Sequence, residues 1–265
     1  MNAGLVLTAL ATATAIGTLA WYYPKMMGNR APLRPRPEQS LMALALGLAA
    51  VGLLLDPDVV GYMLAAIAAL SATLFLLLTF TSGLPRQPPA IAVDAFAPDF
   101  SALDAEGREF HLSELRGAPV LLKFYRGYWC PYCVAELAQL NGIARDFAAL
   151  GVKLVALSSD RVDELRPFKR KHAGDITLLA DPTLAVHRLF NVQQRNFTPR
   201  RGPFRDLAIP TTILIDGDGR VLWLEQAIDF RVRPQALMVL AKTRSLLSVI
   251  TPEDEAANAC DVCAA

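Results

Sequence analysis

The chain has 265 residues, of which 53% are hydrophobic and 19% charged, and its formal net charge is +1. A net charge so close to zero gives no reason to expect nucleic acid as a partner, and four cysteines are too few for a disulfide scaffold. The apolar residues are concentrated in the first 80 positions. We therefore expect a membrane region in contact with a lipid bilayer, followed by a soluble domain.

Three apolar segments make up this predicted transmembrane region, residues 1–80. Residues 5–22 and 59–80 carry no charge and are long enough to cross a bilayer. A cleaved signal peptide is the alternative for the first segment, but it would need a basic start, which is absent. The segment 39–55 is short for a span, so a re-entrant helix is its alternative. We predict three spans.

The charges of the loops predict the orientation. Four basic residues lie between the first two spans, whereas the turn Asp56–Pro57–Asp58 contains none. Basic residues stay on the cytoplasmic side, so three spans place the soluble domain in the cytoplasm, at what we expect to be a bacterial inner membrane. If only two segments cross, the soluble domain is periplasmic.

Residues 81–92 contain three prolines and are predicted to be a linker. Strand-like and helix-like segments then alternate, which is typical of an α/β sheet with helices on both faces. Asp216-Gly217-Asp218-Gly219 is a strong hairpin signal. The predicted strands are 109–115, 120–125, 152–158, 176–180, 211–215 and 220–225; the predicted helices are one that follows Cys130, 161–173, 183–190 and 235–249.

Two cysteines follow the predicted strand 120–125 in the segment FYRGYWCPYC, which ends at Cys133. Pro131 suits the first turn of a helix, where a backbone N–H would have no partner. Cys130 therefore lies at the start of a helix whose N-terminus stabilises a thiolate, and Cys133 lies one turn inside it. This predicts a reactive Cys130 with a lowered pKa.

The chain resembles the thioredoxin-fold redoxins, specifically the peroxiredoxin-like branch of the alkyl-hydroperoxide-reductase and thiol-specific-antioxidant family. The resemblance covers about residues 97–240 and implies a thioredoxin-like redoxin domain, here residues 93–249, with antioxidant or oxidoreductase activity. The segments that carry it are APDF (97–100), FYRGYWCPYC (124–133), LADPTLAVHRLFNV (179–192), IPTTILIDGDGRV (209–221) and DFRVRP (229–234).

Two activities agree with the resemblance. In thiol–disulfide exchange, Cys130 would attack a disulfide-bearing protein or small substrate, Cys133 would resolve the mixed disulfide, and Trp129 would shield the pair, with thioredoxin or glutathione as the reductant. In the alternative, a thiol-dependent peroxidase, the substrate is a peroxide. Peroxiredoxins place a proline seven residues, and a threonine or serine three residues, before the attacking cysteine. This chain has Lys123 and Gly127 there, so we favour exchange.

The resemblance also implies three supporting residues. Pro210 matches the proline that is cis in thioredoxin folds and faces the dithiol, and a cis X–Pro bond costs only about 0.5–1 kcal/mol over trans. The alternative is a trans proline that opens a strand. The arginine that steadies the thiolate could be Arg126 or Arg231, although most arginines are simply solvated.

The predicted flexible tail, residues 250–265, carries a second C-x-x-C pair, Cys260 and Cys263. This pair could act as a relay that reduces a Cys130–Cys133 disulfide. It could instead bind metal, and all four thiolates together would make a zinc set. An accidental pair without function is the third interpretation.

A metal-binding or metal-carrier protein is the alternative from another functional class. Carriers with this fold use C-x-x-x-C and a distant histidine, so the shorter spacing here argues against it. The three histidines, His111, His172 and His187, are far apart in sequence, and we assign them no ligand role. We predict neither a cofactor nor a resident metal.

Overall fold

The computed structural model of the chain describes residues 2–198 and 205–261. The chain forms two compact units. The first contains the residues up to Gly83 together with the short segment Asp229–Val232, and the second contains Leu84–Ile228 and the residues from Arg233 onward.

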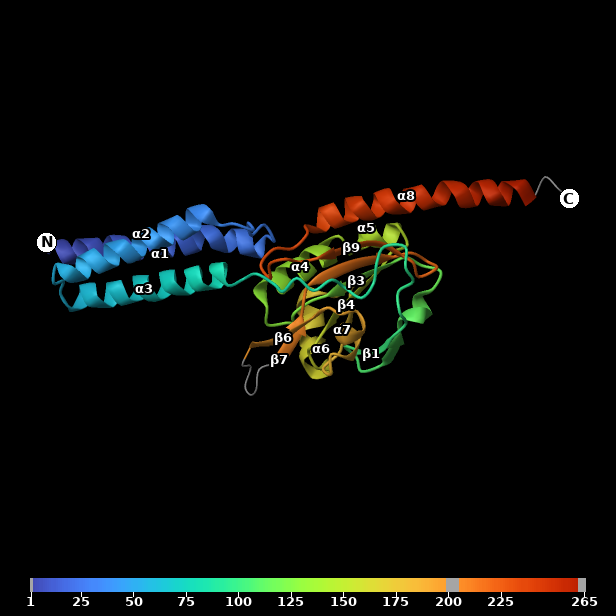
Figure 1. Ribbon diagram of the computed structural model, residues 1–265, viewed down its shortest axis with the longest axis horizontal. Helices are drawn as coiled ribbons and strands as arrows, with labels where there is room; N and C mark the ends of the chain where they lie inside the picture. Colours follow the sequence, from blue (N-terminus) through green and yellow to red (C-terminus); the bar gives the residue numbers. More distant parts are fainter. Residues whose placement is uncertain (1, 199–204, 262–265) are drawn as a thin grey trace. The chain divides into compact units, whose positions relative to one another are not determined.

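The first unit consists of three helices that lie side by side (Figure 1), α1 (Ala3–Met27), α2 (Arg36–Leu54) and α3 (Val59–Phe80). Each is long and apolar enough to cross a membrane. The prediction of three long apolar helices is therefore confirmed. The second helix has 19 residues because it begins at Arg36 rather than at residue 39, which removes the objection that this segment is too short.

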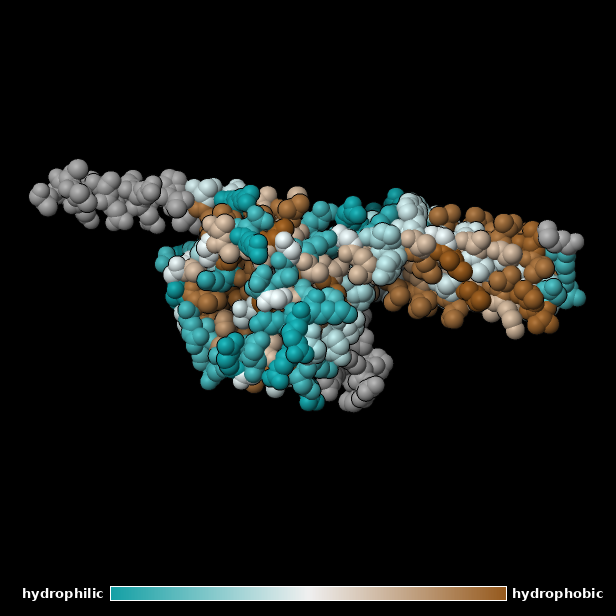
Figure 2. Space-filling view, turned by 180° about the vertical axis from the view of Figure 1, so that it is seen from behind, coloured by the Kyte–Doolittle hydropathy of each residue, from teal (hydrophilic) through white to brown (hydrophobic). Residues whose placement is uncertain are grey.

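Small residues hold these helices together. A Cβ added at Gly4 of α1 would lie only 2.8 Å from the carbonyl oxygen of Gly52 on α2, and the hydroxyl of Thr12 donates to the carbonyl of Leu64 on α3 at 2.8 Å. Such close packing of small residues is typical of helices in membranes. Large apolar side chains point outward and colour the surface of the helices brown in Figure 2; examples are Leu10, Ile16, Leu44, Leu70 and Leu74.

A buried ion pair belongs to the same unit. Arg231 Nη2 lies 2.8 Å from Asp229 Oδ2, and the Ser82 hydroxyl donates to the same carboxylate oxygen at 2.7 Å. Arg231 also donates to the hydroxyl of Tyr22 and to the carbonyl of Leu33. The short segment Asp229–Val232 is thus part of the helical unit.

The second unit is built on a mixed seven-stranded sheet with the order β2-β1-β5-β4-β3-β8-β9 (Figure 1). The three central strands β3, β4 and β5 are parallel, and the outer strands pair antiparallel. A separate hairpin is formed by β6 and β7. The strands are β1 (Ser101–Asp104), β2 (Glu109–His111), β3 (Val120–Phe124), β4 (Lys153–Ser158), β5 (Thr177–Ala180), β6 (Gln193–Thr198), β7 (Arg205–Ala208), β8 (Thr211–Ile215) and β9 (Val221–Gln226).

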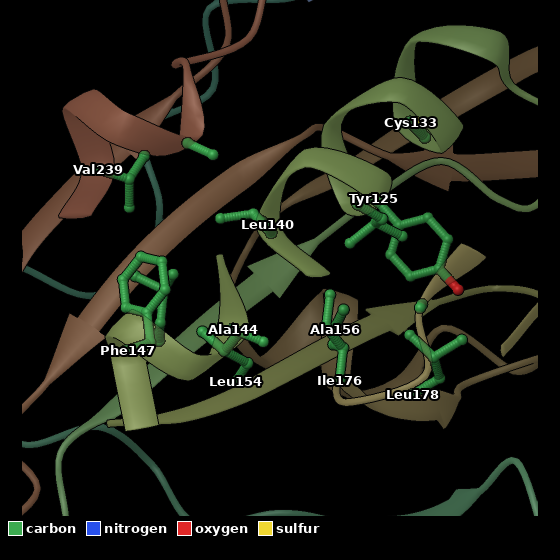
Figure 3. Close-up of a cluster of buried hydrophobic side chains, with 14 of the residues drawn as sticks. Tyr125, Cys133, Leu140, Ala144, Phe147, Leu154, Ala156, Ile176, Leu178 and Val239 are labelled. Atoms are coloured by element: carbon green, nitrogen blue, oxygen red, sulfur yellow. The ribbon is translucent and has the colours of Figure 1, made fainter. Parts of the chain in front are cut away.

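Two hydrophobic clusters cover the two faces of the sheet. On one face, Leu121 packs with Leu137 and Leu140 of α4 and with residues of the other three helices on this side; Figure 3 shows this cluster, with Cys133 and Leu140 on α4. On the other face, Leu122 and Phe124 pack with α7. The helices of this unit are α4 (Pro131–Gly142), α5 (Ala144–Ala149), α6 (Val162–His172), α7 (Ala185–Leu189), α8 (Ala236–Asp261) and the 3-10 turn η1 (Leu112–Leu115).

The predicted thioredoxin-like fold is confirmed, and the Asp-Gly-Asp-Gly sequence forms the hairpin between β8 and β9. The sequence missed β1, β6 and β7, which lack a clear alternation of apolar residues. The predicted strand 109–115 is only half right, because its second half is the turn η1.

The end of the last helix was also mispredicted. The sequence predicts a helix that stops at Val249 and a flexible tail beyond it, but α8 continues to Asp261. The residues after Pro252 are rich in alanine and glutamate, which have high helix propensity, and this explains the longer helix. Cys260 therefore lies in the last turn of α8, and Cys263 lies outside the described residues.

Candidate active site

The dithiol lies between the end of β3 and the start of α4. All five residues of β3 are buried, and α4 begins at Pro131. Cys130 has an extended backbone, with φ −87° and ψ 113°, and its carbonyl accepts from the N–H groups of Cys133 and Val134 at 3.0 Å. Both cysteines are free thiols; Cys130 is 2% exposed and Cys133 is fully buried.

The loop before Cys130 is held by a buried carboxylate. Asp160 accepts from the backbone N–H of Tyr128 at 2.7 Å and from the hydroxyl of Ser158 at 3.0 Å. Gly127 has φ +144°, and a Cβ there would lie 2.6 Å from Trp129 Nε1 and 2.8 Å from Asp160 Oδ1. Only glycine combines this backbone angle with this close approach.

Three buried charged residues lie beside the dithiol. Lys123 Nζ on β3 lies 2.5 Å from Glu136 Oε1 on α4, and the other oxygen of Glu136 lies 3.2 Å from Arg233 Nε. Arg233 Nη2 in turn lies 3.8 Å from Cys133 Sγ. The network therefore runs from the interior of the sheet to the buried sulfur.

Of the two arginines suggested by the sequence, Arg126 belongs to the same unit as the cysteines and lies beside them. Arg126 is buried, its guanidinium lies 5.6 Å from the centre of the Trp129 ring, and its charge interacts with both thiols. Arg231 belongs to the helical unit, where it pairs with Asp229, and its suggested role at the thiolate stays a prediction. The arginine at the sulfur is Arg233, two residues further on.

The two thiols form a hydrogen-bonded pair with unequal acidity. Burial raises the pKa of Cys133, but the hydrogen bond from Cys130 and the charge of Arg233 outweigh this effect and lower that pKa to about 6. The same hydrogen bond, together with burial, raises the pKa of Cys130 well above its ordinary value. The expected low pKa of Cys130 is thus corrected: the negative charge resides first on Cys133, since Arg233 lies next to that sulfur.

Pro210 is placed by the register of the sheet. Thr211 pairs with Phe124, so Pro210 lies level with the residue that follows β3, where the chain turns toward the dithiol. The described residues contain no cis peptide bond, so the expected cis bond before Pro210 is wrong. Trans is the more stable isomer of an X–Pro bond, and here the proline simply precedes β8.

Sequence reasoning overlooked Glu136, Arg233 and Asp160 as parts of the site. Lys123 was noticed only because a peroxiredoxin would have proline there. One signal was available: a lysine at the fourth of five positions in an otherwise apolar strand must find a buried partner. Within residues 2–198 and 205–261, no group of three His, Cys, Asp or Glu side chains could hold a metal ion.

Comparison with known proteins supports a redoxin. Residues 93–224 match the AhpC/TSA family. The chain is 30% identical over 136 residues to the thiol-disulfide oxidoreductase ResA of Geobacillus thermodenitrificans, which covers 51% of this chain and 70% of that protein. It is 29% identical over 126 residues to the peroxiredoxin Bcp of Escherichia coli, covering 47% of this chain and 79% of that one.

The fold likeness extends to solved structures. A cysteine-to-serine mutant of the peroxiredoxin 6 of Arenicola marina superposes with a TM-score of 0.56 at 19% identity. The superposition covers 61% of this chain and 76% of that one, which establishes the thioredoxin-like fold of the second unit.

Proposed function

Because this chain belongs to the AhpC/TSA family and is a redoxin-type thiol oxidoreductase, we propose that it is a membrane-anchored thiol–disulfide oxidoreductase with Cys130 and Cys133 as its reactive dithiol. The observation that carries the proposal is the guanidinium of Arg233, 3.8 Å from Cys133 Sγ. A cation at this distance from a buried thiol stabilises the thiolate that disulfide exchange requires.

The exchange begins with one proton shared by two sulfurs. At pH 7, a pKa of about 6 leaves about nine-tenths of the pair in the thiolate form. Cys133 has no exposed surface and Cys130 is 2% exposed, which supports Cys130 as the sulfur that meets the substrate. The proton of Cys130 passes along the S–H···S hydrogen bond to Cys133 while Cys130 attacks one sulfur of the substrate disulfide.

The remaining steps balance the protons and electrons. The attack forms a Cys130–substrate mixed disulfide and releases the first substrate thiolate, which takes a proton from water. Cys133 then loses its proton and attacks Cys130 Sγ, which releases the second substrate thiol. The substrate has gained two electrons, and the protein is left with a Cys130–Cys133 disulfide. Two thiols of a reductant such as thioredoxin or glutathione restore the dithiol.

A thiol-dependent peroxidase remains the second candidate, because the chain is similar to the peroxiredoxin Bcp. Two observations favour exchange over it. The position of the peroxiredoxin threonine is Gly127, where a Cβ would collide with Trp129 and Asp160. The position of the proline is Lys123, whose side chain is used in the ion pair with Glu136.

The proposal is tested with the full chain in detergent, in a Cys260→Ser/Cys263→Ser background so that only one dithiol reacts. We expect catalysed reduction of a small disulfide, no turnover by Cys130→Ser, and a trapped mixed disulfide in Cys133→Ser. Full activity of Cys130→Ser would refute the assignment. Peroxide consumption at the rate of disulfide reduction would favour the peroxidase.

The same Cys260→Ser/Cys263→Ser background tests the proposed relay. If the second C-x-x-C pair carries electrons to the dithiol, turnover by the wild-type chain with a protein reductant exceeds turnover by the background variant. Equal rates would remove the relay.

We also propose that the three apolar helices span the bilayer and that the redoxin unit is cytoplasmic. A phosphatase reporter that is active only in the periplasm, fused after Ala265, checks the side. Reporter activity would overturn the cytoplasmic assignment without affecting the dithiol chemistry.

A further inference from the structure

One charged residue beside the dithiol takes no part in the exchange reaction. Lys123 is 3% exposed, its Nζ lies 2.5 Å from Glu136 Oε1, and it also donates a hydrogen bond to Thr212 Oγ1 at 2.7 Å. A lysine is almost never buried unless it is paired. Placing this one in the middle of the sheet therefore calls for an explanation.

The position of Glu136 explains why a lysine is buried here. This carboxylate is 2% exposed and lies between two cations, with one oxygen at Lys123 and the other 3.2 Å from Arg233 Nε. Arg233 also faces Cys133 Sγ at 3.8 Å. Without Lys123, the guanidinium of Arg233 would be shared between two buried anions, the carboxylate of Glu136 and the thiolate.

We propose that Lys123 sets the redox equilibrium of the dithiol by neutralising Glu136, which leaves the positive charge of Arg233 available to Cys133. Lys123 is in this sense a positioning residue, since it acts through Glu136 and Arg233 and touches no substrate. The inference concerns the same dithiol as the proposed function and rests on it for the identity of the two reactive sulfurs.

The reaction affected is the reduction of the Cys130–Cys133 disulfide. Two electrons and one proton break the S–S bond and give one thiol and one thiolate, so a negative charge appears where none existed. Arg126 from the loop and Tyr125, the residue that follows β3, also interact with this charge. Whatever stabilises the thiolate shifts the equilibrium toward the reduced form.

Three variants separate the charges: Lys123→Met, Glu136→Gln and the double variant. The full chain, in the Cys260→Ser/Cys263→Ser background, is equilibrated in glutathione buffers, and the reduced fraction is measured by alkylation and mass spectrometry. We expect Lys123→Met to shift the equilibrium constant at least tenfold toward the disulfide, which corresponds to about 30 mV. Glu136→Gln should shift it the opposite way, and the double variant should lie within about threefold of Glu136→Gln, because the lysine has no carboxylate left to neutralise.

Thr212→Val is the matched control, because it removes the hydrogen bond to Lys123 without changing any charge. It should leave the constant within about twofold of the parent chain. If Lys123→Met does not fold, the comparison of Glu136→Gln with the double variant still tests the route, because a lysine that acts through the carboxylate changes nothing once the carboxylate is gone. An unchanged constant in Lys123→Met, or constants that differ at least tenfold between Glu136→Gln and the double variant, would overturn the inference.

These outcomes are distinct from a failure of the proposed function. The equilibrium is measured without turnover of any substrate. A parent chain that reduces no disulfide would refute the exchange reaction, whereas an active chain with an unchanged constant in Lys123→Met would refute only the role of the lysine.

Discussion

Replacing Arg233 by glutamine should raise the first pKa of the dithiol by more than any other single substitution that leaves both sulfurs in place. At 3.8 Å and an effective dielectric constant of about 20, a unit charge stabilises the thiolate by about 4 kcal/mol. At about 1.4 kcal/mol for each pKa unit, this sets an upper limit of about three units. Burial and Glu136 both raise the pKa of Cys133, so we expect it to move from about 6 to above about 8 in Arg233→Gln.

The assay is the ultraviolet absorbance of the thiolate against pH, again in the Cys260→Ser/Cys263→Ser background. A second measurement is the alkylation rate at pH 7, which should fall about tenfold, because the thiolate fraction drops from about nine-tenths to about one-tenth. Arg220→Gln, at an exposed position of the β8–β9 hairpin, is the control and should change neither value. If Arg233→Gln titrates like the parent chain, the thiolate is not stabilised by this guanidinium, and the electrostatic account of the site is wrong.

Three further predictions test the surroundings. Arg231→Gln removes the cation beside the buried Asp229 carboxylate, so thermal or denaturant unfolding should show a loss of about 3–5 kcal/mol. The thiolate titration should not change, because this guanidinium pairs with Asp229; a shifted titration would show that Arg231 also acts on the dithiol. Gly127→Thr forces a β-branched residue to φ +144° and should lower the free energy of unfolding by at least about 1–3 kcal/mol. The variant should consume no peroxide, and a gain of peroxidase activity would disprove the steric argument. Folding lowers the pKa of Cys133, so its thiolate contributes stability to the reduced protein that is present above about pH 9 and is lost as the pH falls to about 6. The free energy of unfolding of the reduced protein should therefore fall more between about pH 9 and about pH 6 than that of the oxidised protein. An equal pH dependence of the two forms would count against the assignment.

The sequence predicted those parts of the fold that local patterns determine. The buried strand before the cysteines, the helix that starts at Pro131 and the Asp-Gly-Asp-Gly hairpin each follow from periodicity or turn chemistry within a few residues. The fold class followed from several such motifs in a familiar order. Strand β1 was not predicted, because only two of its four residues are apolar and because it is stabilised by pairing with β5, which lies far along the chain.

The site was harder to predict because its electrostatics depend on long-range packing. Arg231 and Arg233 lie in the same short motif, and nothing local says which one faces a sulfur. Glu136 lies one turn after Cys133 in sequence, but its importance comes from a lysine on a strand and an arginine that lies 97 residues further along the chain. For the same reason, helix-end arguments alone placed the lowered pKa on Cys130, whereas the neighbouring guanidinium shifts it to Cys133.

The short segment Asp229–Val232 has a consequence for how such a gene can be rearranged. The chain leaves the redoxin unit at Ile228, completes the buried ion pair of the helical unit, and re-enters the redoxin unit at Arg233. A recombination event that exchanged only the first 80 codons would leave the Arg231–Asp229 pair without the Tyr22 hydroxyl that Arg231 contacts. A chimaera that received a different set of N-terminal helices would therefore also need changes in this four-residue segment, which is encoded far downstream in the gene.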